Sequence, residues 1–303
     1  MRGLLQVRGK LLKRTRQLTY LVLHPISHGR CMAAIARSGV NSSPLTSLKY
    51  LGDHLALSLN TSHRREALSQ HHSILAGAVS REVADEIRRG ALLWKRDVGR
   101  EAALRLVLEP SKLAPMEGEL QLTFSFKADL HVLTFIVAPG NVFDLPHAKV
   151  VFIGGLQGRV GRREEIREAS KLNFEIAPAA MLLLAVQAVA KEIGAGALLA
   201  IGEADQISIG YSPLMMRFDY RAFWTGLGGS RRGAFYSIPL VTPKRPLSEV
   251  RLHRSRTRRK REAKKQIRLS IETRLKELFE AKPGAQFHHE PLPIVVLPEA
   301  VEA

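Results

Sequence analysis

The chain has 303 residues, 45% of them hydrophobic and 24% charged, and this length and balance allow a sizeable hydrophobic core. Its single cysteine, Cys31, excludes an internal disulfide and a multi-cysteine metal cluster within one chain, and it fits a reducing compartment. The formal net charge of +18 predicts anionic partners, and nine Lys or Arg with one acid lie between Arg251 and Lys265.

The N-terminal segment is basic and contains no acid before Asp53. Lys10, Lys13 and Arg14 interrupt any apolar run, so we expect an amphipathic helix there and no secretory signal. The longest apolar run, 176–190, is shorter than the roughly 20 residues that a bilayer span needs. We therefore expect a buried helix at 176–190 and a cytoplasmic protein, at most peripheral at the inner membrane.

Residues 1–100 have a mostly helical pattern. Thr61 is expected to cap a helix that runs to Leu75, and Ser80 is expected to cap another that ends at Gly90. Four leucines at helical spacing predict a preceding helix: Leu48, Leu51, Leu55 and Leu59.

From residue 104 onward the apolar period changes to two. This change predicts strands over 104–108, 120–126 and 130–138, the last two joined by a hairpin at Ala128 and Asp129. The almost continuously apolar stretch 149–156 predicts a central strand. A helix after Gly161, a second helix from Pro178 to about Ile193 and a strand over 197–201 are expected next.

The last third of the chain is expected to add a short helix, a strand at 235–240 and a long basic helix at 246–281. Asp219 is expected to cap the short helix, which carries Tyr220, Phe223 and Trp224 as core residues. These patterns predict an α+β fold with a mixed, largely antiparallel sheet and flanking helices. The predicted parts are a basic N-terminal extension (1–47), an α+β core domain (48–245), a basic C-terminal helix (246–282) and a flexible tail (283–303).

The segment 150–169 is predicted to run from a strand through a glycine-rich turn into a helix. It lacks the Gly-Lys-Ser/Thr of a Walker loop and the G-x-G pair of a dinucleotide fold. The turn resembles the pyrophosphate loop of the GNAT acyltransferases, Q/R-x-x-G-x-G/A, with Arg162 breaking the last position. This resemblance implies a GNAT-like sheet and acyl-CoA bound where neighbouring strands splay, by Gln157, Gly158, Arg159, Gly161 and Arg162. The alternative is a glycine turn that only packs a helix against a sheet.

Several segments together resemble the VirK family (VirK/YbjX), a bacterial family of poorly characterised function. They are Tyr50–Leu51–Gly52, His71–His72, Glu117–Gly118–Glu119–Leu120, Phe152–Ile153–Gly154–Gly155–Leu156–Gln157–Gly158, Ile166–Arg167–Glu168–Ala169–Ser170–Lys171, Phe218–Asp219–Tyr220, Phe223–Trp224, Leu227–Gly228–Gly229 and the basic stretch after Pro243–Lys244–Arg245. The resemblance covers about residues 48–275 and departs from the family at 202–206, where Asn and His are missing. It implies a link to virulence-associated envelope and surface properties and assigns no reaction.

The candidates for catalysis are few, and the sequence indicates no metal site. Glu119 and Glu117 flank a strand start and could act as bases, although solvated edge carboxylates are more common. Tyr211 and Tyr220 follow the 197–201 strand, where a GNAT-like site could recruit a general acid. The adjacent His71 and His72 on one helix are expected to be solvated or capping residues.

Two hypotheses follow for the function. The first is an acyl-CoA-dependent N-acyltransferase with an unidentified amine acceptor. The second is a non-enzymatic envelope-associated factor that holds an anionic membrane surface or another polyanion through Arg251 to Lys265. Sequence-specific DNA binding is not expected, because few aromatic residues interleave with the arginines. A deep cleft beside Gln157 favours the first hypothesis, and a cleft filled by side chains favours the second.

Overall fold

One mixed sheet organises the protein in the computed structural model, which describes residues 15, 19–40, 44–99, 102–146, 148–210, 219–241 and 254–280. The strand order is β1-β2-β3-β4-β5-β6-β8-β7, and β5 with β6 is the parallel pair in an otherwise antiparallel sheet. The strands are β1 Ala91–Asp97, β2 Ala103–Pro110, β3 Leu120–Phe126, β4 Ala128–Pro139, β5 Lys149–Gly158, β6 Ala197–Ile201, β7 Ser230–Arg232 and β8 Phe235–Ile238. The predicted α+β class and the central position of β5 are confirmed.

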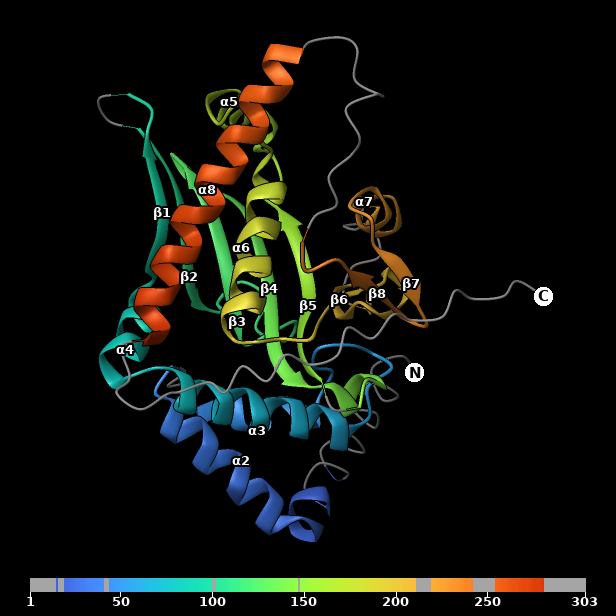
Figure 1. Ribbon diagram of the computed structural model, residues 1–303. Coiled ribbons are helices and arrows are strands. Elements are labelled where there is room, and N and C mark those ends of the chain that lie inside the picture. The colour runs from blue at the N-terminus through green and yellow to red at the C-terminus, as the bar shows by residue number, and fades with distance from the viewer. Residues whose placement is uncertain are drawn as a thin grey trace, which may run out of the picture.

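Helices cover one face and one end of this sheet (Figure 1). The helices α6 and α8 lie next to each other across the strands, while α3 lies at the end of the sheet with α2 packed outside it. The helical elements are α2 Pro25–Ser38, η1 Pro44–Leu51, α3 Thr61–Ala78, α4 Arg81–Arg89, η2 Gly140–Phe143, α5 Arg163–Leu172, α6 Pro178–Glu192, η3 Glu203–Asp205, η4 Ile207–Gly210, α7 Tyr220–Gly226 and α8 Arg254–Glu280.

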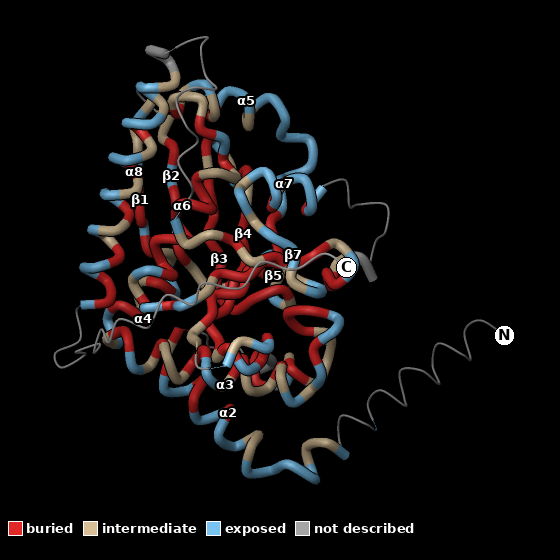
Figure 2. The backbone as a smooth tube through the Cα atoms, turned by 45° about the vertical axis from the view of Figure 1, so that its right-hand side comes forward, coloured by how far each residue is buried: buried red, intermediate tan, exposed pale blue. Residues whose placement is uncertain are grey.

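The two covering helices differ because their surroundings differ. Helix α6 is buried over almost its whole surface between the sheet and α8, which explains why its sequence is apolar on every side (Figure 2). Helix α8 has one apolar stripe at helical spacing, made of Ala263, Ile267, Ile271, Leu275, Leu278 and Phe279, and this stripe packs on α6 and β1. Most charged residues on the remaining surface of α8 are exposed to solvent, while Lys260, Lys264 and Arg268 are half-buried.

The helix boundaries follow from local chemistry. Pro178 occupies the first turn of α6, where its missing N–H costs nothing, and the side chains of Ser80 and Asp219 cap α4 and α7 as predicted. Asn60, one residue earlier than predicted, caps α3 by accepting a hydrogen bond from the N–H of His63 at 2.8 Å. Trp224 and Tyr220 of α7 are buried in the core, which confirms their predicted place.

Two predictions for the first hundred residues are wrong. The helix predicted from Leu48 to Leu59 is a 3-10 helix that ends at Leu51, and Leu55 has a φ of 68°, which no helix continues through. The N–H of Leu55 instead donates to the carbonyl of Met116, so burial and not helical periodicity explains Leu55 and Leu59, while Leu48 is 40% exposed. The residues of β1, expected to be helical, pair antiparallel with β2.

The parallel strands β5 and β6 separate halfway along. Their pairing runs from Val150 opposite Ala197 to Ile153 opposite Ala200, and then β6 ends at Ile201. Strand β5 continues to Gly158 and pairs with β4 on its other side. One edge of β5 is therefore without a strand partner over residues 154–158, and the candidate site lies beside this edge.

Candidate functional site

Glu117 is the centre of the candidate site, in the connection that leads from β2 into β3. Its side chain is only 3% exposed, and its carboxylate accepts hydrogen bonds from Gln157 Nε2 at 2.9 Å and from Gln206 Nε2 at 3.3 Å. Gln157 comes from the end of β5, and Gln206 comes from the turn after β6. Glu117 thus links the end of β5 to the turn after β6 through these two hydrogen bonds.

Glycines make room for this acid. A Cβ at Gly154 would lie 1.8 Å from the backbone oxygen of Glu117, and a Cβ at Gly155 would lie 2.0 Å from its Oε2 atom. A Cβ at Gly118 would lie 2.7 Å from the backbone nitrogen of Phe135. Two of the segments that resemble the VirK family, 117–120 and 152–158, therefore contact each other at this point. Gly154 and Gly155 are required for contact with Glu117 itself.

A small pocket of about 120 Å³ opens beside the carboxylate. It combines an acid with an apolar wall and with Arg159, and it is much smaller than the pockets of several hundred Å³ that hold whole cofactors. Its lining residues are Leu113, Ala114, Glu117, Val132, Thr134, Gly155, Gln157, Gly158 and Arg159. Three of the residues predicted to bind acyl-CoA, namely Gln157, Gly158 and Arg159, thus belong to one pocket.

The environment of Glu117 favours its protonated form more than water does. Burial raises the pKa of this carboxyl, and hydrogen bonds from Ser208, Gln206 and Gln157 offset only part of that rise. Gln206 also presents a buried Oε1 oxygen that has no hydrogen-bond partner within the described part of the chain. A carboxylate with a raised pKa beside another acceptor suits a ligand that brings N–H donors.

Tyr220 fills the gap between the separated strands. Its hydroxyl donates to the carbonyl of Leu156 at 3.0 Å and accepts from the N–H of Leu156 at 3.1 Å. Gln206 Nε2 lies 3.1 Å from the same hydroxyl, so Tyr220 reaches Glu117 through Gln206. Burial raises the pKa of Tyr220, and the side chain does not line the pocket. Tyr220 therefore positions the site, and Tyr211 lies outside the described residues.

The end of the glycine-rich turn is more exposed than the pocket. Position by position, the two small residues of the GNAT pattern fall on Val160 and Arg162, and Gly161 lies between them with a φ of 79°. Arg162 pairs with Glu165 at 2.7 Å, which places a carboxylate in the first turn of α5. Gly161 and Arg162 do not line the pocket, so the structure separates them from the other three predicted binding residues.

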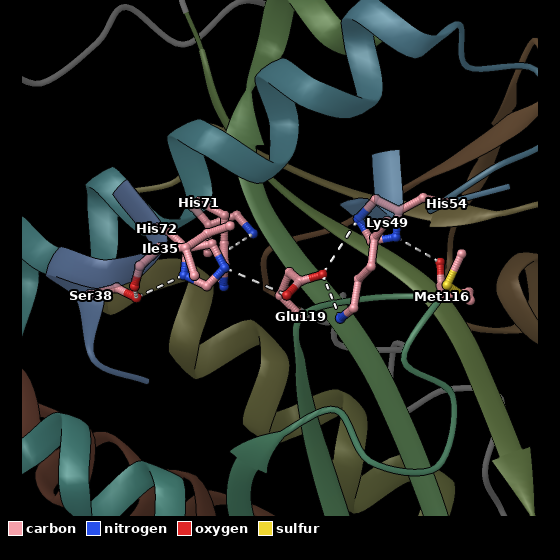
Figure 3. Close-up of polar contacts among 9 residues, drawn as sticks. Ile35, Ser38, Lys49, His54, His71, His72, Met116 and Glu119 are labelled. Carbon is pink, nitrogen blue, oxygen red and sulfur yellow. Dashed lines mark hydrogen bonds and ion pairs between the residues drawn. The ribbon is translucent and has the colours of Figure 1, made fainter. Parts of the chain in front are cut away.

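Glu119 points into a different cluster, in which His54, His72 and Glu119 itself are buried (Figure 3). Its Oε1 atom lies 3.0 Å from Lys49 Nζ and 3.5 Å from His54 Nε2, and its Oε2 atom lies 3.6 Å from His72 Nε2. His72 is held on its other side by Ser38 Oγ, 2.8 Å from Nδ1. The cluster therefore ties α2, η1 and α3 to the start of β3.

The cluster shifts the pKa values of its members in opposite directions. Burial alone would raise the pKa of Glu119, but the contact with His72 and the charge of Lys49 lower it to about 2. Burial lowers the pKa of His54 to about 4 and also lowers the pKa of His71, whose Nδ1 accepts from the N–H of Val137. At neutral pH the cluster thus contains an ion pair between Glu119 and Lys49, with His54 and His71 as neutral imidazoles.

Several sequence-based expectations for these residues are wrong. His71 and His72 are buried and are neither solvated nor capping residues, because α3 lies between the sheet and α2. Glu117 and Glu119 are buried as well, and their side chains enter separate environments. Lys49, His54 and Gln206 were not among the residues predicted from the sequence. Lys49 and Gln206 reach their acidic partners from 70 and 89 residues away, so no local sequence pattern indicates these contacts.

Comparisons with known proteins identify a family and no closer relative. The model of a family described as "Protein of unknown function (DUF535)" matches residues 10–272. No curated protein and no solved structure matches the chain. Among the helices that the structure describes, none combines the length and the apolar content that a membrane span needs.

Proposed function

The chain belongs to the DUF535 family, which is the VirK family, and we propose that it is an N-acyltransferase that uses acyl-CoA and has Glu117 as its general base. The observation that carries this proposal is the buried acid with a raised pKa, which faces a pocket beside the separating strands β5 and β6. Perturbed acids in concave sites are typical of catalysis, although ion-pair networks also produce them.

The chain's own residues suit the acceptor half of such a reaction. A primary amine enters the pocket as an ammonium ion, and the Glu117 carboxylate accepts one of its protons, which leaves a neutral nitrogen free to attack. Gln157 holds the carboxylate at 2.9 Å, while Leu113 and Val132 form an apolar wall that limits water. Acyl-CoA, when bound, would supply a thioester whose carbonyl carbon is the electrophile. The new C–N bond forms as the C–S bond breaks, and CoA leaves as the thiol after its sulfur takes the second proton of the attacking nitrogen.

The fit to the donor is weaker than the fit to the acceptor. Arg159 at the pocket rim can contact a phosphate, but Val160 and Arg162 occupy the positions where the pyrophosphate pattern has small residues. Arg162 already pairs with Glu165. The proposal therefore rests on the acceptor pocket, and binding of acyl-CoA needs its own test.

Calorimetric titration of acetyl-CoA at physiological ionic strength provides this test. We expect saturable binding at one site that Gly161→Leu weakens, because a φ of 79° strains any residue with a Cβ. Glu117→Gln is expected to bind acetyl-CoA as the original chain does. Binding that Gly161→Leu keeps and that added salt abolishes would show nonspecific attraction to a basic protein and would leave the turn with a structural role.

A second candidate function is favoured by the first half of α8. Lys260, Lys264 and Arg268 follow one another at intervals of four residues, and burial together with both neighbouring cations lowers the pKa of Lys264. Like charges at this spacing oppose the helix, and the one acid within 257–268 is Glu262. Lys260 already donates to the carbonyl of Glu175, and Arg268 donates to Gln187 at 3.0 Å. The exposed cations Arg258 and Lys265 of the same half of α8 are open to a ligand, so we propose nucleic acid without sequence preference as the alternative ligand.

Fluorescence anisotropy with random-sequence RNA over a series of salt concentrations distinguishes this alternative. Replacing exposed Arg258 and Lys265 by glutamine should weaken binding and reduce the salt slope by about 2. The control is Lys276→Gln at the other end of α8, where Lys276 pairs with Glu280 at 3.7 Å. Equal effects of both changes would mean that net charge, and not Arg258 and Lys265 in particular, attracts the RNA.

A further inference from the structure

We propose that the outer face of the N-terminal helices docks on an anionic lipid bilayer. Three large apolar side chains close together in sequence are mostly exposed: Val22 at 77%, Leu23 at 68% and Ile26 at 71%. Met32, further along α2, is 44% exposed. Isolated exposed apolar residues are ordinary, but a group on adjacent helical turns indicates a surface that contacts something else.

The inner face of the same helices already has its packing partners. Cys31 and Ile35 of α2 are buried against Tyr50 and Leu68 in a small separate core. Tyr20 packs on this core and accepts a hydrogen bond from Arg65 of α3 at 2.6 Å, which fixes the turn that precedes α2. The outward direction of Val22 and Ile26 therefore follows from the packing of the helix, and the core does not need them.

Charge identifies the occupant. The first 52 residues contain nine Lys or Arg and no Asp or Glu. Arg30 and Arg37 are exposed on α2 beyond the apolar group, and α2 shows long exposed stretches in Figure 2. Exposed apolar side chains flanked by cations match the interface of an anionic bilayer, which receives the apolar groups between its headgroups and attracts the cations.

The proposed lipid contact of α2 differs from a membrane span and is separate from the basic half of α8. None of the helices within the described ranges meets the requirements of a span, so contact with lipid would be peripheral. The basic half of α8 lies at the opposite end of the molecule from α2, as Figure 1 shows, so a flat bilayer that meets α2 does not also meet the first turns of α8. The two surfaces can be tested separately.

Flotation of the full chain with vesicles tests the proposal. We expect binding to vesicles of phosphatidylglycerol and phosphatidylcholine, and weak binding to vesicles of phosphatidylcholine alone. Ile26→Glu should lower the partition coefficient about tenfold, and Val22→Glu combined with Ile26→Glu should lower it further, because apolar burial and charge attraction are both lost. The matched control is Val160→Glu, which introduces the same charge at an apolar residue that is 89% exposed on the turn before α5.

Each outcome decides the proposal. Loss of binding in Ile26→Glu with retention in Val160→Glu supports it. Equal losses in both variants, or unchanged binding in Ile26→Glu, would overturn it, since attachment would then not involve this face. Light scattering after size exclusion tests whether a second copy of the chain covers this face instead. If the original chain were a dimer that does not bind vesicles, and Ile26→Glu were a monomer, the face would be a dimer interface and the lipid proposal would be refuted.

Discussion

Replacing His54 by glutamine should make the protein less sensitive to acid. His54 is fully buried, its Nδ1 atom lies 3.1 Å from the carbonyl of Met116, and burial lowers its pKa from 6.5 to about 4. A histidine that is neutral when buried must be protonated more readily in the unfolded chain. Its contribution is therefore present above pH 6.5 and is lost as the pH falls towards 4.

The magnitude follows from the size of this shift. The complete loss corresponds to about 3 kcal/mol of unfolding free energy, of which about 2 kcal/mol falls between pH 7 and pH 5. Glutamine can still donate to the Met116 carbonyl and does not titrate. The separate contribution of Glu119, whose pKa is lowered to about 2, is present above pH 4.5 and is lost only at lower pH.

Urea unfolding followed by circular dichroism at pH 7 and pH 5 measures this contribution. The original chain should lose about 2 kcal/mol more than His54→Gln between the two pH values. Other groups that titrate in this range, including His71 and His131, are present in both proteins and cancel in the difference. If both proteins lost the same free energy, His54 would not be a buried neutral imidazole and the description of the cluster would be refuted.

Two further predictions concern packing, and each has a matched control. Gly154→Ala should destabilise the fold by about 1–3 kcal/mol or more, because the new Cβ would lie 1.8 Å from the backbone oxygen of Glu117. Gly77→Ala, where nothing lies within 4 Å, should instead stabilise α3 by about 0.5–1 kcal/mol, and thermal unfolding would contradict the reasoning if both changes acted alike. Leu275→Ala should cost about 2–5 kcal/mol, and Leu269→Ala, at a residue that is 48% exposed, should change stability by less than about 0.5 kcal/mol in urea unfolding. Equal effects of the two leucine changes would mean that α8 does not pack on the sheet through its apolar stripe.

The sequence predicted the elements whose signal is local. The alternation at 120–126, the continuous apolar run of β5 and the capping residues Ser80 and Asp219 each depend on neighbouring residues, and the structure confirms them. β1 was missed because a register shift between Leu92 and Trp94 breaks its alternation and because it follows a helical region, so its identity depends on pairing with β2.

The candidate site depends on contacts that no local pattern encodes. Glu117 meets Gln157 and Gln206, which are 40 and 89 residues away, and Glu119 meets Lys49 from 70 residues away. Two acids separated by one glycine at a strand start look like solvated edge residues unless the covering layer is known. Gly154 and Gly155 belong to the glycine-rich segment predicted at 150–169, and the group that approaches them is Glu117.

Thiol release from acetyl-CoA in the presence of a panel of primary amines tests the proposed role of Glu117 most directly. We predict release with at least one amine, and a decrease of about a hundredfold or more in Glu117→Gln while acetyl-CoA affinity and thermal stability are retained. A Glu117→Gln variant as active as the original chain, or no release from the original chain with any amine, would contradict the assignment of Glu117 as the base of an acyl transfer.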